Sequence, residues 1–437
     1  MSDVLVILAD DLTGATDAAV AFAKRGARTD VWLDRPRALS DVDVAAIDLD
    51  TRALPPVAAA DRVRTLLSAL PPGVRLAKKI DSTLRGNIAA ETDALLAGRE
   101  GAVAIVVPAH PRNGRVQRDG ILLVDGLPVH ESDFGRDLFT PVGSSDVRRH
   151  LPEGRTALIS APGMLGGRAA LARELTAAVG GGARAVTIDA QTEDDLTAIT
   201  ALVAEDGRYI CVGSAGLLEA FAPCVLGGVE AARGNPAPAR GSVRHPVLFV
   251  IGSLSSMTHS QIARFSDCGG TTEMIDPRTI LIDEGRARSQ AIAARIDAAL
   301  GADEDVLVAL SSDRSDVEAA LSMGRLHGFD VPTTSRALRE RFVELVAPLL
   351  AKAGTVVLSG ADVARTFLAR AGIEGVRIIG EATANIPLAR AIGSDVLVVT
   401  KAGGSGTPQT YLDIARGAVS GTRGAGLARP NAHLRAP

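Results

Sequence analysis

VLVILADDLTGATDAAVAFAKRG, residues 4–26, decides the fold class of this chain. The apolar run Val4–Ala9 predicts a buried strand, and a helical pattern follows from about Thr13 to a terminating glycine. Asp10 and Asp11 lie between the two, at the end of the strand where open α/β sheets bind their ligands. One aspartate can cap the helix. A pair is more than a cap needs, so we interpret both as candidate site residues.

The same alternation of strand and helix runs through most of the 437 residues. Short apolar runs predict strands at Val4–Ala9, Val44–Asp48, Ala102–Val107, Thr156–Ile159, Ala185–Ile188, Tyr209–Val212, Val247–Ile251, Asp305–Ala309, Thr355–Leu358, Val376–Gly380 and Val396–Thr400. Helical patterns lie between many of them, at Ala15–Arg25, Ala169–Val179, Leu196–Glu205, Ser260–Phe265, Gln290–Leu300 and Asp362–Ala371. Such a pattern is typical of α/β proteins, whose parallel sheets are covered on both faces.

The length suggests two or three domains. The composition changes at 227–245 (GGVEAARGNPAPARGSVRH), which lacks periodicity and is rich in glycine, proline and arginine, as interdomain linkers are. We predict an N-terminal domain at 1–230, a linker at 231–243, a C-terminal domain at 244–420 and a loose tail at 421–437. Each domain is expected to be a mainly parallel, Rossmann-like sheet with helices on both faces.

The composition narrows the class of protein. Hydrophobic residues make up 46% of the chain and charged residues 22%, as in globular proteins. The net charge of −4, without basic blocks, argues against a nucleic-acid partner. No apolar run approaches the roughly 18 residues of a membrane helix, and three cysteines without a CxxC pair fit a reducing cytoplasm. We expect a cytoplasmic protein with small-molecule partners and no membrane or nucleic-acid contact. Homo-oligomerisation is left open.

Polar side chains are concentrated in LAKKIDSTLRGNIAAE, residues 76–91. Cations, hydroxyls and a guanidinium precede a helix that is predicted to begin near Asn87. This combination favours a site for a carboxylate or phosphate that carries hydroxyls. The alternative is a solvated turn with a salt bridge. The candidates are Lys79, Asp81, Ser82, Thr83 and Arg85.

The segment after Val107 is long and irregular, which is typical of functional loops. A hairpin is predicted around Asp125-Gly126. The segment also carries His110 and His130. A lone histidine in a loop more often lies on the solvated surface than takes part in catalysis, so neither residue is counted as catalytic.

Three strand–loop–helix junctions follow the predicted linker. The first carries Gly252, Ser253 and Ser255, then Thr258 and Gln261 at capping-box spacing. The second carries Ser359-Gly360 ahead of a helix from about Asp362. In the third, Lys401 and GGSG at 403–406 precede Thr407, the expected N-cap, and Pro408 at the first helical position. Backbone N–H groups in such loops converge on anions, so the three together favour nucleotide phosphates.

Several known nucleotide and catalytic motifs are absent from the sequence. No GxxxxGK[ST] string occurs, which excludes a P-loop enzyme. No GxGxxG follows the first strand, which argues against a dinucleotide. HExxH and GxSxG are absent as well.

Taken together, these segments resemble the four-carbon acid sugar kinase family, whose members phosphorylate threonate, erythronate or 3-oxo-tetronate with ATP. The resemblance covers nearly the whole chain and rests on ADDLTGA at 9–15, KKIDSTLRGN at 78–87, PAHPRNGR at 108–115, GSAGL at 213–217, GSLSSMTHSQ at 252–261, SGAD at 359–362, GE at 380–381 with Pro387, and KAGGSG at 401–406. The chain departs from the usual family pattern at His110, Ala361, Ala384-Asn385, Ala402 and Ser405.

The resemblance implies an ATP-dependent kinase acting on a hydroxyl of a four-carbon sugar acid, the terminal 4-hydroxyl being expected. It implies that Asp10, Asp11, Arg52 and the Lys79–Arg85 segment bind the acid. It also implies that the nucleotide is bound by Ser253, Ser255, Gly360, Asp362, Gly380, Gly403, Gly404 and Gly406. A carboxylate must accept the proton of the attacking hydroxyl, and Asp11 and Asp81 are the candidates. Mg²⁺ is expected to accompany ATP, without a nameable protein ligand.

Two alternatives are open from the sequence. One is a non-catalytic two-domain sensor of a small acidic metabolite, which the departures in the glycine loops support. The other is a sugar-acid oxidoreductase, which the missing dinucleotide fingerprint disfavours. The sequence leaves undetermined which acid and stereoisomer is used.

Overall fold

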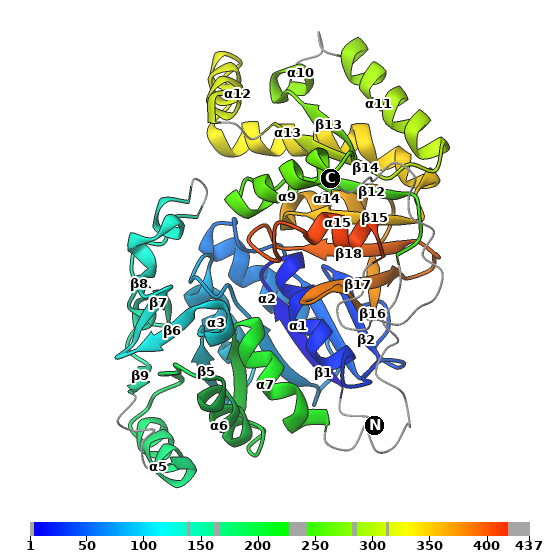
Figure 1. The fold of residues 1–437 in the computed structure, drawn as a ribbon. Helices are drawn as coiled ribbons and strands as arrows, with labels where there is room; N and C mark the ends of the chain where they lie inside the picture. The colour runs from blue at the N-terminus through cyan, green and yellow to red at the C-terminus, as the bar shows by residue number, and fades with distance from the viewer. Residues whose placement is uncertain are drawn as a thin grey trace. The chain divides into compact units, whose positions relative to one another are not determined.

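The computed structural model describes residues 4–137, 140–160, 167–226, 243–281, 286–311 and 314–417. The chain divides into two compact units, residues 1–237 and 238–437, which are described separately (Figure 1). The predicted linker lies outside the described residues except for Val243, which is buried in the core of the C-terminal unit. The predicted tail at 421–437 also lies outside them.

The N-terminal unit is built on an eight-stranded parallel sheet. Its strands are β1 (Leu5–Ala9), β2 (Thr29–Leu33), β3 (Val44–Asp48), β4 (Arg75–Lys79), β5 (Val103–Val107), β9 (Thr156–Ile159), β10 (Ala185–Ile188) and β11 (Tyr209–Gly213). They lie in the order β2-β3-β1-β4-β11-β5-β10-β9, and every neighbouring pair is parallel. The carboxyl ends of β3, β1, β4, β11 and β5 therefore lie side by side along one edge of the sheet.

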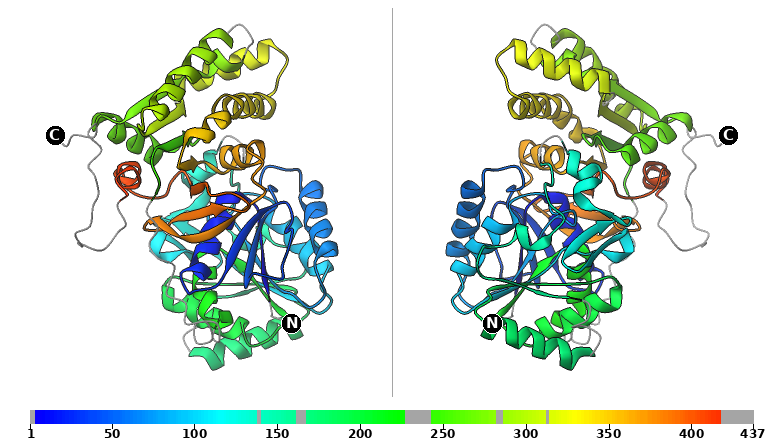
Figure 2. Two further views of the ribbon diagram at one scale, coloured as in Figure 1. Left: turned by 90° about the vertical axis from the view of Figure 1, so that its right-hand side faces the viewer. Right: turned by 90° about the vertical axis from the view of Figure 1, so that its left-hand side faces the viewer.

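Helices cover both faces of this sheet (Figure 2). They are α1 (Leu12–Ala23), α2 (Pro56–Ala69), α3 (Ile88–Ala97), α5 (Gly167–Gly180), α6 (Glu193–Val203) and α7 (Ala215–Leu226). α1, α5, α6 and α7 pack in a row, and α2 packs against α3. From β1 the chain crosses to β2 at one edge of the sheet, and from β3 it crosses in the opposite direction to β4. Because crossovers between parallel strands are right-handed, α1 and α2 lie on opposite faces of the sheet, each with the helices that pack beside it.

A small antiparallel sheet follows β5. It consists of β6 (Arg115–Arg118), β7 (Ile121–Val124) and β8 (Leu127–Pro128). The predicted turn at Asp125-Gly126 joins β7 to β8, and both residues have positive φ. Short 3-10 turns border this sheet at η1 (Pro111–Asn113), η2 (Val129–Glu131), η3 (Asp133–Arg136) and η4 (Val147–His150).

The C-terminal unit has a seven-stranded sheet of strands β12 (Val247–Ile251), β13 (Thr271–Ile275), β14 (Val306–Leu310), β15 (Thr355–Ser359), β16 (Gly375–Thr383), β17 (Ile386–Ala391) and β18 (Leu397–Lys401). The order is β13-β14-β12-β15-β18-β17-β16, and only β17 runs antiparallel to its neighbours. The helices are α9 (Ser256–Asp267), α10 (Pro277–Leu281), α11 (Arg286–Gly301), α12 (Arg314–Leu326), α13 (Val331–Val346), η6 (Ala347–Lys352), α14 (Ala361–Arg370) and α15 (Thr410–Ala415). α9 packs with α15, and α13 packs with α14.

The predicted α/β class is confirmed, but some local predictions were wrong. Strands β2, β4, β13 and β17 were missed, because β4 (RLAKK) and β13 (TTEMI) carry charged residues that mask an apolar pattern. The N-cap of α9 is Ser255, whose Oγ accepts a hydrogen bond from Thr258 N at 3.2 Å. Thr258 instead donates its hydroxyl to the Gly403 carbonyl. α15 begins at Thr410 with Gln409 as its cap, so neither Thr407 nor Pro408 starts it.

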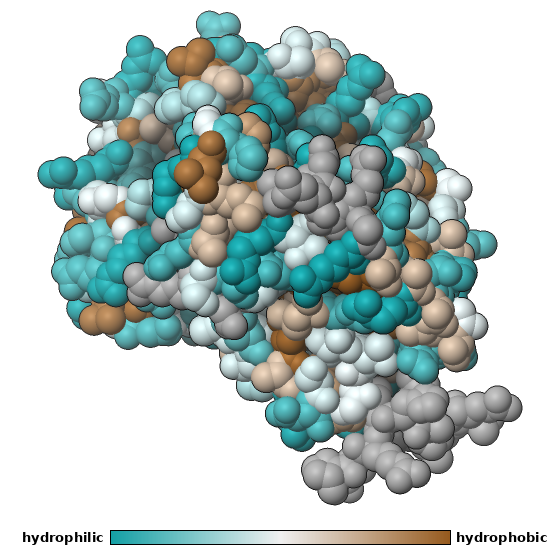
Figure 3. Space-filling view, turned by 90° about the horizontal axis from the view of Figure 1, so that it is seen from above, coloured by the Kyte–Doolittle hydropathy of each residue, from teal (hydrophilic) through white to brown (hydrophobic). Residues whose placement is uncertain are grey.

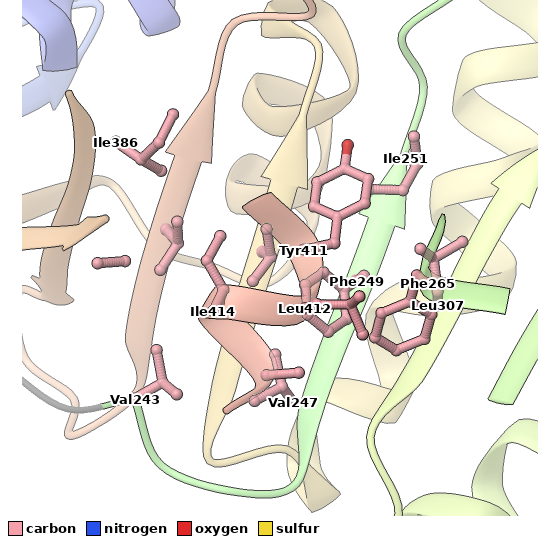
Figure 4. Close-up of a cluster of buried hydrophobic side chains, with 14 of the residues drawn as sticks. Val243, Val247, Phe249, Ile251, Phe265, Leu307, Ile386, Tyr411, Leu412 and Ile414 are labelled. Carbon is pink, nitrogen blue, oxygen red and sulfur yellow. The ribbon is translucent and has the colours of Figure 1, made fainter. Parts of the chain in front are cut away.

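A buried hydrophobic cluster of the C-terminal unit lies between its sheet and the pair α9 and α15 (Figure 4). Phe249 of β12 contacts Phe265 of α9 with ring centroids 5.2 Å apart, and Tyr411 of α15 at 5.5 Å. Aromatic residues are only 3% of the chain. Three of these few aromatic side chains are buried together here, and their buried apolar surface helps to hold α9 and α15 on the sheet.

The face of the molecule in Figure 3 is mostly hydrophilic, with apolar residues scattered over it. Exposed single apolar residues such as Leu326 and Phe329 are ordinary on globular surfaces. Among the described residues, no helix combines the length and apolar character that a bilayer crossing requires.

We expect Phe265→Ala to destabilise the C-terminal unit by about 3–5 kcal/mol, because it leaves a cavity against Phe249. Phe329→Ala is the matched control. Its side chain is partly exposed, so its loss should change stability by less than about 1 kcal/mol. Denaturant unfolding of the two variants measures the difference. Equal effects would contradict the assignment of this junction as the core.

Candidate active site

A single guanidinium joins the ends of two neighbouring strands. Asp10 and Asp11 follow β1, and Arg52 follows β3. Arg52 Nε and NH2 donate to the two carboxylate oxygens of Asp10 at 2.8 and 3.0 Å, and NH1 donates to Asp11 Oδ2 at 2.5 Å. All three residues are largely or wholly buried. The three side chains therefore lie together at the carboxyl edge of the sheet.

Asp11 also caps α1, as one aspartate of the pair was expected to do. Its Oδ1 accepts from Gly14 N at 2.7 Å and its Oδ2 from the Thr13 hydroxyl at 3.1 Å. Asp10 has no cap role in α1 and is instead held by Arg52. Asp11 therefore both caps α1 and pairs with Arg52, whereas Asp10 only pairs with Arg52.

Charge pairing overcomes burial at these groups. Burial by itself raises the pKa of Asp10, but the Arg52 charge and hydrogen bonds, with Lys79 and Lys78, hold it below its ordinary value. Burial likewise tends to lower the pKa of Arg52, but the charges of Asp10, Asp11 and Asp81 hold it well above its ordinary value. Asp10 and Arg52 are therefore both ionised at neutral pH.

The loop after β4 carries the second ion pair. Arg85 donates from Nε and NH2 to the two oxygens of Asp81 at 2.9 and 3.1 Å. Thr83 donates its hydroxyl to Asp81 as well. Although burial opposes it, the charges of Arg85 and Arg52 and these hydrogen bonds hold the pKa of Asp81 well below its ordinary value. The salt bridge weighed as an alternative exists, but Asp81 is buried, not solvated.

Tertiary contacts hold this loop in an uncommon conformation. Leu84 is buried with a φ of 65°, and Gly86 has a φ of 93°. A Cβ on Gly86 would meet Arg52 Cγ at 3.3 Å. Asn87 donates to the carbonyls of Thr51 and Leu54, both at 2.8 Å, which ties the loop to the segment that carries Arg52. Ser82 lies partly buried in the same turn.

The two adjacent lysines of β4 point to different places. Lys78 is fully buried and pairs with Glu91 of α3 at 2.5 Å, which is a structural contact. Lys79 donates to the Ile80 carbonyl at 2.9 Å. A Cβ added to Gly14 would lie 3.0 Å from Lys79 Nζ and 2.6 Å from Asp11 Oδ1, so the ammonium lies beside the start of α1.

The structure adds two residues that were not among the candidates, His110 and Arg115. They form an isolated β-bridge after β5, with Arg115 N donating to the His110 carbonyl at 3.1 Å. Burial, with the charges of Arg115, Lys79 and Arg112, lowers the pKa of His110 to about 4. The ring is therefore neutral at pH 7. The sequence signal was their position after a strand at the same edge of the sheet.

A cavity of about 250 Å³ adjoins the cluster. Its lining includes Arg52 and Arg85 together with Gly86, Asn87 and Thr140. It is large enough for a small organic acid, and it lies wholly within the N-terminal unit.

In the C-terminal unit, three loops at the carboxyl ends of β12, β15 and β18 meet. Thr258 donates to Ser253 Oγ at 3.0 Å and to the Gly403 carbonyl at 3.1 Å. A Cβ on Gly403 would clash with Ser253 Oγ, and one on Gly360 would lie 3.3 Å from Ser253 N. Gly360 faces backbone and has a φ of 100°, both of which favour glycine, whereas Gly403 packs against the Ser253 side chain.

The other predicted nucleotide residues occupy different positions. Gly404 has open space where a side chain would lie. Gly406 has a φ of 86°, and a Cβ on this residue would clash with the Thr410 hydroxyl. Ser255 caps α9 beside this group. Asp362, in the first turn of α14, pairs with Arg339 at 3.2 Å. Gly380 lies within β16 at an irregularity in its pairing with β17.

No group of three histidine, cysteine, aspartate or glutamate side chains is placed to hold a metal ion in the part of the chain that the structure describes. The adjacent carboxylates of Asp10 and Asp11 are paired with Arg52. Mg²⁺ keeps several waters and binds chiefly through substrate phosphates, so MgATP does not require a dedicated set of protein ligands.

Two family models match the chain. A model described as a sugar-binding N-terminal domain matches residues 5–221, and one described as a nucleotide-binding C-terminal domain matches residues 248–411. The fold is shared with a solved structure described as a putative tRNA synthase from Salmonella typhimurium LT2, with a TM-score of 0.76 and 24% identity over 93% of this chain and 98% of that one.

Relatives of known activity define the class of enzyme more narrowly. A D-threonate kinase of Cupriavidus necator is 36% identical over 394 residues, which cover 88% of this chain and 89% of that protein. A D-threonate kinase of Salmonella typhimurium is 31% identical over 94% of this chain and 97% of that protein. Further relatives are named D-erythronate kinase and 3-oxo-tetronate kinase. The protein is thus a carbohydrate kinase. It belongs to the four-carbon acid sugar kinase family, as its sequence motifs indicated.

We expect His110 to make the protein acid-sensitive. Its pKa is about 4 in the folded state against an ordinary 6.5, so the unfolded chain binds the extra proton between these values. The free energy of unfolding should fall as pH drops from 6.5 towards 4, by up to about 1.4 kcal/mol per pH unit from this group. Relative to wild type, His110→Gln should lose that part of the slope.

The control is His130→Gln, which changes an exposed histidine in the same unit. Urea unfolding of the three proteins at several pH values between 4 and 7 measures the slopes. Parallel stability curves for wild type and His110→Gln would show that His110 is protonated as readily in the folded protein as in the unfolded chain.

Proposed function

We propose that this enzyme transfers the γ-phosphoryl group of ATP to the terminal 4-hydroxyl of a four-carbon sugar acid, with D-threonate as the first candidate. The observation that carries the proposal is the buried ionic cluster in which Arg52 holds Asp10 and Asp11 and Arg85 holds Asp81. The relatives from Cupriavidus necator and Salmonella typhimurium are both named D-threonate kinase, and these names support this choice of acid.

In this proposal each unit binds one of the two substrates. The N-terminal unit would bind the acid through its hydroxyl, carboxylate and cationic groups, namely Asp10, Asp11, Arg52, Lys79, Asp81, Ser82, Thr83 and Arg85. The C-terminal unit would bind ATP at the meeting point of its three loops. Backbone N–H groups around Gly403, Gly404 and Gly406 suit phosphate oxygens, because glycine allows close approach. Asp362 and Gly380 would contact other parts of the nucleotide.

In the proposed reaction, the 4-hydroxyl oxygen attacks the γ-phosphorus, the bond to the bridging oxygen breaks, and ADP leaves. Phosphoryl transfer depends mainly on positioning and charge neutralisation. A carboxylate accepts the proton of the hydroxyl. Asp81 is a weak proton acceptor, because the charges of Arg85 and Arg52 and its hydrogen bonds hold its pKa well below the ordinary value. Asp11 is therefore the favoured base.

Mg²⁺ belongs to this proposal as part of the MgATP substrate. It would bridge phosphate oxygens and neutralise their charge. Lys79, whose ammonium lies beside Asp11 at the start of α1, would add a fixed positive charge near the transferred group.

The decisive assay measures ADP release from ATP with D-threonate, D-erythronate and 3-oxo-tetronate. A kinase releases one ADP for each phosphorylated acid. Binding of an acid without ADP release would indicate a sensor. Acid-dependent reduction of a nicotinamide cofactor would indicate an oxidoreductase. Either result would reject the proposed function.

We expect Asp11→Asn to lower kcat by about 100-fold or more while the fold remains intact. Asparagine is as good an N-cap as aspartate, so the bond to Gly14 N can be kept while the proton acceptor is lost. Asp81→Asn is the comparison. It should weaken the Arg85 contact and raise the KM for the acid more than it lowers kcat. The reverse pattern would exchange the two assignments.

Two glycine variants test the phosphate loop. Gly404→Ala should leave thermal stability unchanged, because a Cβ there meets nothing within 4 Å, and should raise the KM for ATP by about tenfold. Gly403→Ala should lower stability as well, because its Cβ would meet Ser253. A Gly404→Ala enzyme with wild-type KM for ATP would remove this loop from the nucleotide site.

A further inference from the structure

Lys401 is the last residue of β18 and lies directly before the glycine-rich run 403–406. A lysine beside a phosphate-binding loop commonly contacts the phosphate itself, as a point charge. The side chain of Lys401 is 0% exposed, so its ammonium does not reach a ligand at the surface of the loop. It points into the protein instead, where Nζ lies 5.6 Å from the centroid of the buried Tyr411 ring.

The Lys401 ammonium binds the backbone of its own loop. Nζ donates to the carbonyl of Ala402 at 3.0 Å and to the carbonyl of Gly403 at 2.9 Å. In a planar trans peptide, the carbonyl of one residue and the N–H of the next point in opposite directions. The two carbonyls point at Lys401, and the N–H groups of Gly403 and Gly404 therefore point away from it.

These two N–H groups are available to a ligand. Gly403 is partly exposed and Gly404 is exposed. Neither N–H donates a hydrogen bond to any group in the part of the chain that the structure describes. The space where a side chain on Gly404 would lie is also open, since a Cβ there meets nothing within 4 Å. Successive N–H groups directed to one side of a turn bind anions such as phosphate.

Glycine by itself does not hold this arrangement. The peptide between Gly403 and Gly404 can turn over readily, because a residue without a Cβ tolerates both signs of φ. That backbone freedom has to be lost before both N–H groups can bind one phosphate, and the loss weakens binding. Lys401 fixes the orientation of the peptides in advance. Its bonds to the two carbonyls also polarise the peptides, which makes their N–H groups stronger donors.

We propose that Lys401 is a positioning residue for the nucleotide, which orients the N–H groups of Gly403 and Gly404 towards the phosphates of ATP without contacting them. The inference rests on the proposed function and assigns the means by which the phosphate loop is preorganised. The positive charge of Lys401 lies behind the same two peptides and favours an anion in front of them. Lys401 therefore increases the affinity for ATP through the backbone of the loop.

The test compares the wild-type enzyme with Lys401→Met, Lys401→Gln and Lys352→Met. Methionine approximates the volume of the lysine stem but has neither the charge nor a donor, whereas glutamine keeps a neutral N–H donor. Lys352 is an exposed lysine of the same unit that pairs with Asp297 at 2.7 Å, and it serves as the matched control.

The Met variant should fold, because each carbonyl keeps a second donor. Ser405 N donates to the Ala402 carbonyl at 3.0 Å, and the Thr258 hydroxyl donates to the Gly403 carbonyl at 3.1 Å. Thermal melting of every variant checks the fold. If Lys401→Met does not fold, Lys401→Gln carries the comparison.

Calorimetry without the acid measures the Kd of MgATP and the Kd of adenosine, which lacks phosphates, and steady-state kinetics give the KM for ATP and for the acid. We expect Lys401→Met to raise the Kd of MgATP and the KM for ATP about 10- to 100-fold. The Kd of adenosine and the KM for the acid should change little. Lys401→Gln should recover part of the loss, and Lys352→Met should behave as wild type.

Two results would overturn the inference. One is an unchanged Kd of MgATP in the folded Lys401 variants. The other is an equal loss of affinity for MgATP and adenosine, which would make Lys401 a structural residue of the whole unit. The proposed function is tested separately by the wild-type enzyme. If that enzyme binds MgATP but releases no ADP with any of the acids, the proposed reaction fails, and calorimetry of the Lys401 variants still decides the inference.

Discussion

The candidate site depends on one constraint, the sharing of Arg52 between two carboxylates at the end of β1. Two adjacent buried aspartates repel each other unless a cation lies between them. Arg52 supplies that cation from the next strand, 41 and 42 positions along the chain. Its own loop is fixed by backbone bonds from Thr51 and Arg52 to the Asp10 carbonyl. Removing the guanidinium would leave uncompensated charge in the interior, so this contact is required for both fold and site.

The conformation of the loop that carries Asp81 and Arg85 also depends on the position of Arg52. Gly86 packs against Arg52, and Asn87 binds carbonyls on either side of it. The positive φ of Leu84 is the kind of local strain that surrounding contacts must maintain. Lys78 contributes from the opposite side of β4 by its buried pair with Glu91. A dense polar motif therefore folds as a rigid unit in which most charges already have partners.

The C-terminal loops use steric fit where the N-terminal site uses charge. Gly403 packs against the Ser253 side chain and Gly360 against the backbone of Gly252 and Ser253, so that three strand ends come close enough to share hydrogen bonds. Gly404 lies in the same run but meets nothing. Within one glycine-rich string, then, one glycine is closely packed and its neighbour has open space on its side-chain side. Composition gives no means of telling them apart, since both are simply glycine.

The sequence by itself determined the α/β class, the strand ends at which polar residues gather, and the motifs of the four-carbon acid sugar kinase family. These features are local, because a buried parallel strand, a helix and a turn each have a period or composition that a short window contains. Strands β4 and β13 were missed where charged residues broke that period. Only the tertiary structure decided which charges pair, which serine caps α9, and that the Lys401 side chain is wholly buried. Those outcomes depend on contacts between residues tens of positions apart, whose geometry is set by packing and by the cost of burying unpaired charge.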